Sequence, residues 1–188
     1  MVRLYLKLMK LIIGLGNPGK KYKNSRHNVG FRLIDESVTR DTRYEKRTPS
    51  KIKKLVTCYV SPVTDVLLAK PQTFMNESGR AVKTLVNFYK VSLDNLWVIH
   101  DDLDIKLGEH KIQKGRGPKV HNGVNSVEEA LGSKDFWRVR IGIENRISGY
   151  RDIGISGEKY VLEDFNPEEL TTFSPVIDKI IQELKYQT

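Results

Sequence analysis

One histidine stands where general-base chemistry is feasible. His27 precedes Asn28 and the apolar run "VGF", which predicts the start of a helix. The dipole at a helix N-terminus lowers the pKa of a histidine, so we expect His27 to stay neutral, as a general base must. The alternative is a histidine that caps the helix or lies on the surface, and residue types alone favour that simpler role.

A second group of ionisable residues follows an apolar segment. The stretch "WVIHDDLDIKLG" places His100, Asp101, Asp102 and Asp104 at the predicted end of a strand. A carboxylate there can orient a histidine by bonding one ring nitrogen, which leaves the other nitrogen free to act as a base. A Mg²⁺ site is the alternative, but no other ligand cluster accompanies these residues, so we predict no metal. For Asp102 and Asp104 a solvated turn also stays open.

Three asparagines, each beside a predicted sheet edge or helix start, form a pattern: Asn17, Asn76 and Asn122. A neutral amide both donates and accepts hydrogen bonds. Such a set suits a peptide backbone, or a carbonyl oxygen that gains negative charge, more than it suits a metal or a bare phosphate. Capping a helix is the alternative role, above all for Asn76. Phe74, two residues earlier, has the character of a core residue.

The turn "GLGNPG" fits the G-x-G-x-x-G pattern of dinucleotide-binding proteins. In those proteins a helix begins at the third glycine, so that its N-terminus faces a pyrophosphate. Here Gly19 is followed by "KKYKNS", which has no helical periodicity, and the next helix is expected only near Val29. We therefore expect no dinucleotide, and we interpret the turn as one that holds the Asn17 amide at the carboxyl edge of the sheet.

Strand-like and helix-like segments alternate along most of the chain. Apolar runs, several rich in Val and Ile, predict strands at residues 10–15, 52–60, 63–70, 96–100, 109–113 and 138–143. Helical spacing and capping signals predict helices over residues 29–39, 77–89, 123–131 and 167–185. The alternation predicts a single α/β domain, a three-layer sandwich with a twisted, mixed and largely parallel sheet flanked by helices. Residues 1–8 are expected to extend before the first strand or to pair at a sheet edge.

Composition narrows the class of function. The 188 residues carry a formal net charge of +9, which favours a polyanionic partner such as nucleic acid, with solubility alone as the alternative. Cys58 is the single cysteine, so no internal disulfide forms, and this fits a reducing cytosol. No segment approaches the roughly 20 apolar residues of a membrane span, so we expect a cytoplasmic protein without membrane contact.

At these residues the chain resembles the bacterial-type peptidyl-tRNA hydrolase family. The matching stretches, in the family's order, are "LIIGLGNPGKKYKNSRHNVGF", "PQTFMNESGRAV", "VIHDDLDIKLG", "HNGVNSV" and "FWRVRIGIEN", with a weaker echo in "YVLEDFNPEEL". The resemblance implies hydrolysis of the ester between a peptide's carboxyl end and the 3′ ribose of tRNA, with no cofactor. It also implies that His27 is the catalytic base and that Asp101 orients it.

The same resemblance supplies an expected substrate-binding set. Asn17 matches the amide beside the base, and Asn76 and Asn122 match residues that hold the peptide and the water or oxyanion. We add Tyr22 and Phe74, which lie in the same motifs. The implied mechanism is attack on the ester carbonyl by a water molecule that His27 deprotonates, with an asparagine amide steadying the oxyanion.

Basic residues near the third and fifth motifs are the expected tRNA contacts: Lys111, Lys114, Arg116, Lys119, Arg138 and Arg140. Arg140 matches a family position that clamps tRNA, whereas the position of the clamping lysine holds Gln113. The stretch "KGRGPKVHNG" also departs from the family's glycine-rich loop. These departures concern the grip on tRNA rather than the chemistry.

Two other functions compete with this interpretation. One is an RNA-binding protein on the same scaffold that has lost catalysis, a role known among the family's plant-organelle splicing-factor relatives. The other is a nucleotide-dependent oxidoreductase. The joint presence of His27, Asp101 and the three asparagines favours the enzyme, because a binding module need not keep them together. We expect a monomer whose partner is peptidyl-tRNA.

Overall fold

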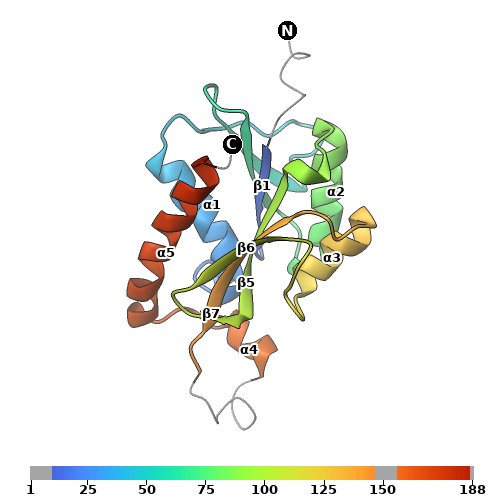
Figure 1. Cartoon of the computed structure of the whole chain (residues 1–188). Helices are drawn as coiled ribbons and strands as arrows, with labels where there is room; N and C mark the ends of the chain where they lie inside the picture. The colour runs from blue at the N-terminus through green and yellow to red at the C-terminus, as the bar shows by residue number, and fades with distance from the viewer. Residues whose placement is uncertain (1–9, 147–155, 187–188) are drawn as a thin grey trace.

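A computed structural model of the chain contains one seven-stranded sheet, in the strand order β2-β3-β4-β1-β5-β7-β6 (Figure 1). The structure describes residues 10–146 and 156–186, so the expected extension at residues 1–8 lies outside the described residues. The strands are β1 Lys10–Gly14, β2 Glu45–Lys46, β3 Val56–Val60, β4 Val66–Pro71, β5 Leu96–Lys106, β6 His110–Lys114 and β7 Trp137–Glu144.

The centre of the sheet is parallel. Strand β1 pairs in parallel with β4 and with β5, and β5 pairs in parallel with β7. The outer strands are antiparallel to their neighbours, since β3 pairs with β4, β2 with β3 and β6 with β7 in that sense. The predicted mixed, largely parallel sheet is confirmed.

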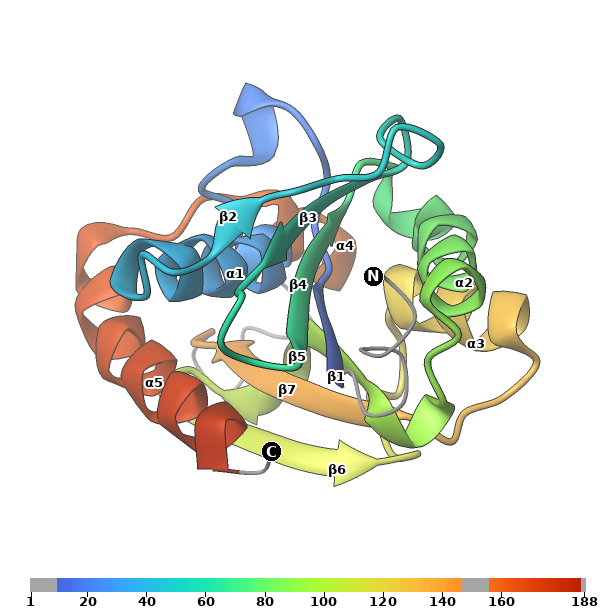
Figure 2. The ribbon, with the colours of Figure 1, turned by 90° about the horizontal axis from the view of Figure 1, so that it is seen from above.

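Helices cover both faces of the sheet (Figure 2). The α-helices are α1 Val29–Arg40, α2 Ser78–Tyr89, α3 Asn122–Leu131, α4 Gly157–Leu162 and α5 Pro167–Tyr186. One face packs against α1, α4 and α5, and the other packs against α2 and α3. Alternate residues of β1 serve the two cores, because Ile12 faces the first set of helices while Leu11 and Ile13 face the second. The predicted three-layer sandwich is thereby confirmed.

The longest helix, α5, begins with the capping arrangement that its sequence predicts. The Asn166 side chain accepts a hydrogen bond from the backbone N–H of Glu169 at 2.8 Å, and the Glu169 carboxylate accepts one from the backbone N–H of Asn166 at 2.9 Å. These two bonds satisfy backbone donors that a helix start otherwise leaves unpaired. Within the described residues, no helix combines the length and the apolar character needed to cross a bilayer.

Several element boundaries differ from the sequence-based expectation. The strand expected at 52–60 begins only at Val56. Ile52 is buried, as its apolar side chain suggests, but it belongs to a turn and not to a strand. The strand expected at 63–70 begins at Val66. The expected helix at 77–89 is preceded by a 3₁₀ turn, Met75–Glu77. The short elements β2 and α4 were not predicted, because neither contains enough residues for a periodic apolar pattern.

Strand β5 is longer than expected, and this corrects the placement of the acidic residues. We expected the strand to end at His100, with Asp101 and Asp102 just beyond it, whereas β5 continues to Lys106. The carboxylates of both aspartates are buried and accept hydrogen bonds from neighbouring side chains, so acidic residues persist inside the strand. The pairing of β5 with β7 changes register between Asp102 and Lys106, an irregularity of the kind often found beside active sites.

The segment between β1 and α1 contains two 3₁₀ turns, Lys20–Tyr22 and Arg26–Asn28. No α-helix begins at Gly19, whose φ is 106°, and α1 starts at Val29 as expected. The helix N-terminus that a dinucleotide pyrophosphate requires is therefore absent from this described segment. His27 is instead carried by the second turn, directly before α1.

Two glycines bring α1 close against β1. A Cβ atom on Gly14 would lie 2.2 Å from the carbonyl oxygen of Gly30, and one on Gly30 would lie 2.5 Å from Leu15 backbone atoms. Neither distance leaves room for a methyl group, and the atoms in the way are backbone atoms that cannot rotate aside. The glycines therefore fix the depth at which α1, and the His27 turn before it, sit on the sheet.

We predict that Gly30→Ala lowers the free energy of unfolding by roughly 1–3 kcal/mol, the scale of overpacking in a core. The measurement is the urea midpoint with an unchanged slope. Gly157→Ala is the matched control, because its Cβ would meet only the terminal Cδ1 of Leu103, at 3.0 Å, which a rotamer change relieves. Equal stability of the two variants would contradict the close-packing argument.

Candidate active site

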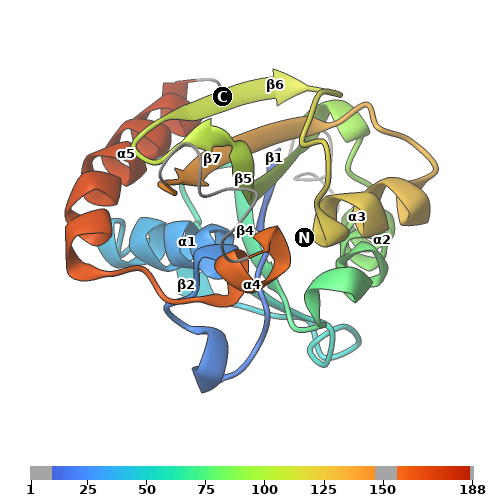
Figure 3. The same cartoon turned by 90° about the horizontal axis from the view of Figure 1, so that it is seen from below.

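The candidate site lies where the chain leaves the carboxyl ends of the central strands, the end of the sheet seen in Figure 3. Asn17 follows β1, Met75 follows β4, Asp101 lies within β5 and His121 directly precedes α3. Open α/β sheets bind their ligands at this edge, because loops from several strands converge there. The topology thus brings together residues that are up to about a hundred positions apart in the sequence.

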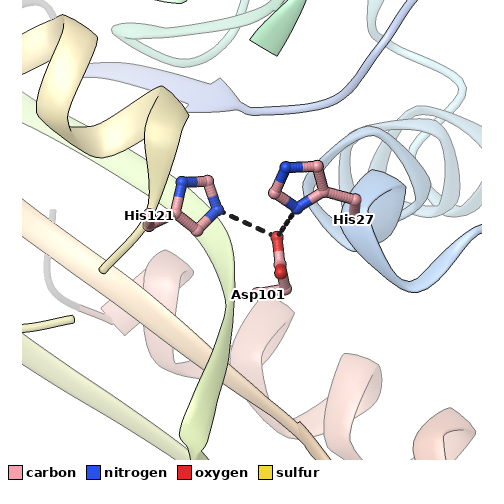
Figure 4. Close-up of side chains that lie close together, drawn as sticks. All are labelled: His27, Asp101 and His121. Atoms are coloured by element: carbon pink, nitrogen blue, oxygen red, sulfur yellow. Dashed lines mark hydrogen bonds and ion pairs between the residues drawn. The ribbon is translucent and has the colours of Figure 1, made fainter. Parts of the chain in front are cut away.

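Two histidines share one carboxylate oxygen (Figure 4). His27 Nδ1 lies 2.8 Å from Asp101 Oδ1, and His121 Nε2 lies 2.9 Å from the same oxygen. The two imidazole rings have their centroids 4.9 Å apart. All three residues are buried, and His27 retains 8% of its surface. The pairing of His27 with Asp101 is the contact that the resemblance implies, whereas the convergence of His121 on the same atom was not anticipated.

Backbone contacts determine the tautomer of His121. Its Nδ1 accepts hydrogen bonds from the backbone N–H groups of Gly123 and Val124, at 3.1 and 3.2 Å. A nitrogen that accepts carries no proton, so the ring is neutral with its proton on Nε2, which donates to Asp101. His121 thus caps α3 with one nitrogen and holds Asp101 with the other. The signal in the sequence was a polar residue directly before a helix, in "VHNGV".

The electrostatics of the pair differ from our expectation. Burial lowers the pKa of His27, but the charge and hydrogen bond of Asp101 outweigh it and raise the pKa above the ordinary 6.5. We had expected the helix dipole to lower this pKa, and that expectation was wrong because a carboxylate lies in direct contact. Burial favours the neutral form of Asp101, yet the two histidines hold its pKa well below the ordinary value. Asp101 is therefore an anion that only accepts hydrogen bonds.

His100 packs against the trio of His27, Asp101 and His121 but is not part of it. Its Nδ1 donates to the carbonyl oxygen of Asp101 at 2.7 Å, and its ring packs edge-on against His121, 5.0 Å between centroids. Burial lowers the pKa of His100 to about 3, so the ring stays neutral. Its Nε2 is buried and has no partner among the described residues.

The backbone and the side-chain oxygen of Asn17 form hydrogen bonds with neighbouring residues, and its amide NH₂ group stays available. Its backbone N–H and C=O bond the side chain of Asn28, at 2.8 and 2.9 Å, and its Oδ1 accepts from the backbone N–H of Met75 at 2.8 Å. The Nδ2 group has no partner among the described residues. Sequence reasoning missed Asn28, although it follows His27 directly.

The remaining expected substrate residues form no hydrogen bond to the trio His27, Asp101 and His121. Asn76 and Asn122 are exposed. The apolar character of Phe74 had indicated a core residue, but Phe74 is 56% exposed. Tyr22 is half-buried in the first 3₁₀ turn. No hydrogen bond joins any of these four side chains to another described residue, so their amide, phenyl and phenol groups are available to a ligand.

The trio also has the residue types of a metal centre. His27, Asp101 and His121 each offer one ligand atom, and these atoms lie within 4.8 Å of one another. Both imidazole nitrogens, however, face a single carboxylate oxygen at hydrogen-bond distance, with a proton between each pair. A cation would have to replace both protons, so the arrangement fits a hydrogen-bonded network better than a ligand set.

Among the expected tRNA contacts, the two arginines of β7 are engaged inside the protein. Arg138 is only 2% exposed, and its guanidinium pairs with Glu128 at 2.8 Å. The prediction that Arg138 contacts phosphate therefore does not fit its position, because β7 turns that side chain toward α3. Arg140 pairs with the buried Asp102 at 2.7 Å and bonds Gln113 at 2.7 Å, and part of it reaches a cavity.

The other cations lie at the surface, and two of them, Lys111 and Lys119, line that cavity. Lys114 is engaged with Asp94 and Asp135, and Lys119, 86% exposed, lies 3.7 Å from Asp104. Lys111 and Arg116 are exposed and form no ion pair with another described residue. The cavity, of about 690 Å³, is lined by four cations, Lys106, Lys111, Lys119 and Arg140, and by two carboxylates, Asp104 and Glu144, so its lining has an excess of positive charge.

Comparisons with known proteins agree with one another. The family model described as peptidyl-tRNA hydrolase matches residues 11–188. The peptidyl-tRNA hydrolase of Lawsonia intracellularis is 38% identical, over 96% of this chain and 88% of that protein, and the Geotalea daltonii enzyme is 40% identical, over 92% and 86%. The crystal structure of the peptidyl-tRNA hydrolase from Acinetobacter baumannii is similar with a TM-score of 0.80 and 29% identity, covering 94% of this chain and 87% of that one.

We predict that His121 is a neutral Nε2–H tautomer, because its Nδ1 accepts two backbone hydrogen bonds. Long-range ¹H–¹⁵N correlation spectra of ¹⁵N-histidine-labelled protein measure this directly. His100, whose Nδ1 donates to a carbonyl, is the internal comparison and should show the opposite tautomer. A proton on His121 Nδ1 would contradict the assigned network.

Proposed function

The chain belongs to the peptidyl-tRNA hydrolase family, and on that premise we propose how its own residues cleave the ester of peptidyl-tRNA. The activity is hydrolysis of peptidyl-tRNA to a peptide and free tRNA. In this proposal His27 is the general base, Asp101 orients it, and Asn17, Asn76 and Asn122 bind the substrate. The observation that carries it is the buried contact between His27 Nδ1 and Asp101 Oδ1 at 2.8 Å.

The proton inventory supports a base at His27. Asp101 accepts from Nδ1–H, so the unprotonated nitrogen of a neutral His27 is Nε2. A water molecule bonded to Nε2 loses a proton as its oxygen attacks the ester carbonyl carbon. The bond from that carbon to the ribose oxygen then breaks, and His27 returns the proton to the ribose oxygen. The products are a peptide carboxylic acid and a tRNA hydroxyl, so all atoms are accounted for.

Neutral amides suit the charge that develops during this attack. The carbonyl oxygen becomes an oxyanion, and the unengaged Nδ2 group of Asn17 is a donor that its own side-chain oxygen holds in place through Met75. Exposed Asn76 and Asn122 would bond the peptide backbone, and Tyr22 and Phe74 would contact the substrate nearby. We place the action in the cytoplasm, where peptidyl-tRNA arises. We also propose that the protein acts as a monomer.

We predict that His27→Ala lowers kcat by about 100-fold or more, the scale of lost general-base catalysis. In the parent enzyme kcat/KM should fall as the pH drops through the pKa of His27, because only the neutral ring accepts a proton. That midpoint lies above 6.5, since Asp101 raises the pKa. The assay is release of free tRNA from a labelled N-acyl-aminoacyl-tRNA.

Asp101→Asn tests the orienting role in the same assay. Removing the negative charge should move the pH midpoint downward, and combining this change with His27→Ala should cost little more than His27→Ala alone. The proposal fails if His27→Ala keeps the parent turnover, or if the two losses add.

We further propose that the cationic cavity holds tRNA phosphate. Lys111→Ala should raise KM for full-length peptidyl-tRNA while leaving kcat on a short aminoacylated 3′-fragment unchanged. The magnitude of the salt slope of tRNA binding should fall by about 0.7–0.9 for one lost phosphate contact. Lys111 is preferable to Arg140 because losing Arg140 would leave the buried carboxylate of Asp102 without its cation.

Lys134→Ala is the matched control for this measurement. Lys134 is 75% exposed and lies 3.5 Å from Glu128, beside α3 and outside the cavity lining. An equal loss of tRNA affinity in both variants would show that net charge alone, rather than the cavity, attracts tRNA.

A further inference from the structure

The turn that carries His27 is fastened to the C-terminal part of the chain by a buried ion pair. Arg26, directly before His27, is 6% exposed, and its Nη2 donates to both oxygens of Glu169, at 3.0 and 2.7 Å. Glu169 is 3% exposed and lies in the first turn of α5. One guanidinium nitrogen thus bonds both carboxylate oxygens, and because both groups are ionised these hydrogen bonds are stronger than neutral ones.

Further contacts of Arg26 restrict its position from other sides. Its guanidinium lies over the ring of Tyr160 at 4.1 Å, and its Nη1 donates to the Tyr160 carbonyl oxygen at 3.3 Å. Its backbone N–H donates to the carbonyl oxygen of Glu163 at 3.0 Å. Residues of α4 and α5 therefore hold the side chain of Arg26, and Glu163, between the two helices, holds its backbone.

Glu169 is also held by a contact that does not involve Arg26. Its carboxylate also accepts from the backbone N–H of Asn166 at 2.9 Å, as part of the α5 cap. Burial alone raises the pKa of Glu169, but the Asn166 N–H and then Arg26 outweigh it and lower the pKa, so the group is ionised. The pair thus joins a rigid helix start to the His27 turn.

His27 is consequently held between two buried neighbours that do not contact the trio's atoms. Asn28, which follows His27, makes two hydrogen bonds with the Asn17 backbone. Arg26, which precedes His27, bonds Glu169. Asn28 sets the base relative to the β1 turn, and Arg26 sets it relative to α5.

We propose that Arg26 and Glu169 form a positioning pair that aligns His27 with Asp101 for turnover. The inference rests on the proposed role of His27 as the general base. It assigns a function in catalysis to the C-terminal segment, which supplies no atom to the trio. A misplacement of a base by about 1 Å lowers a rate by roughly 100-fold.

The test compares Glu169→Gln and Arg26→Lys with the control Glu168→Gln. Glu168 is the exposed neighbour in the same helical turn, so the control repeats the charge loss without touching Arg26. Circular dichroism first establishes that all variants are folded. With a short N-acyl-aminoacyl 3′-fragment as the substrate, we expect kcat to fall roughly 10- to 100-fold in Glu169→Gln and in Arg26→Lys. KM should change by less than about twofold, and Glu168→Gln should match the parent. The double variant should lose no more than the larger single loss.

A second readout separates positioning from folding. The proton that His27 Nδ1 shares with Asp101 gives a downfield NMR signal, which should move or broaden in Glu169→Gln and stay in place in Glu168→Gln. Arg26→Lys keeps the charge and tests the pair if Glu169→Gln does not fold. An unmoved signal with parent kcat, or a loss of kcat that follows only the folded fraction, overturns the proposal. Parent turnover in His27→Ala would instead refute the proposed base, and the NMR signal would still report on positioning.

Discussion

The candidate site depends on the buried negative charge of Asp101. An ionised carboxylate that is 2% exposed is strongly unfavourable unless donors surround it, and removing one partner from a buried pair of this kind typically costs roughly 3–5 kcal/mol. Two imidazole N–H groups meet that need at one oxygen. Because the carboxylate only accepts, both rings must present a proton to it, so this one charge sets which nitrogen of each ring is left free.

The two histidines use their free nitrogens for different purposes. His121 accepts backbone N–H groups at the start of α3, so its ring is fully engaged and cannot take a proton from water without losing a cap. His27 has no hydrogen bond to a described residue at Nε2, and it keeps a small exposed surface. The same carboxylate therefore holds one structural histidine and one that is open to chemistry, and the surrounding backbone decides which is which.

Periodicity predicted the long elements well. The helix expected at 29–39 is α1, and the one expected at 167–185 is α5. Both have apolar faces long enough to give a recognisable helical periodicity in the sequence. Errors concentrate where tertiary contacts override the local pattern. Residues 52–55 are apolar in part but form a turn, and β5 extends past His100 because β7 continues to supply backbone partners and Arg140 pairs with Asp102.

The residue types and their order indicate which chemistry is available: a histidine before a helix, an acidic run after an apolar strand, and asparagines at loop ends. They also indicate the alternation that makes an α/β sandwich, because these signals are local. Which residues meet depends on the way the chain folds in three dimensions. The tertiary structure placed His121 on Asp101, engaged Arg138 with Glu128 and tied the His27 turn to α5 through Arg26. Such pairings join residues far apart in the chain, and their burial and charge depend on packing that no local pattern encodes.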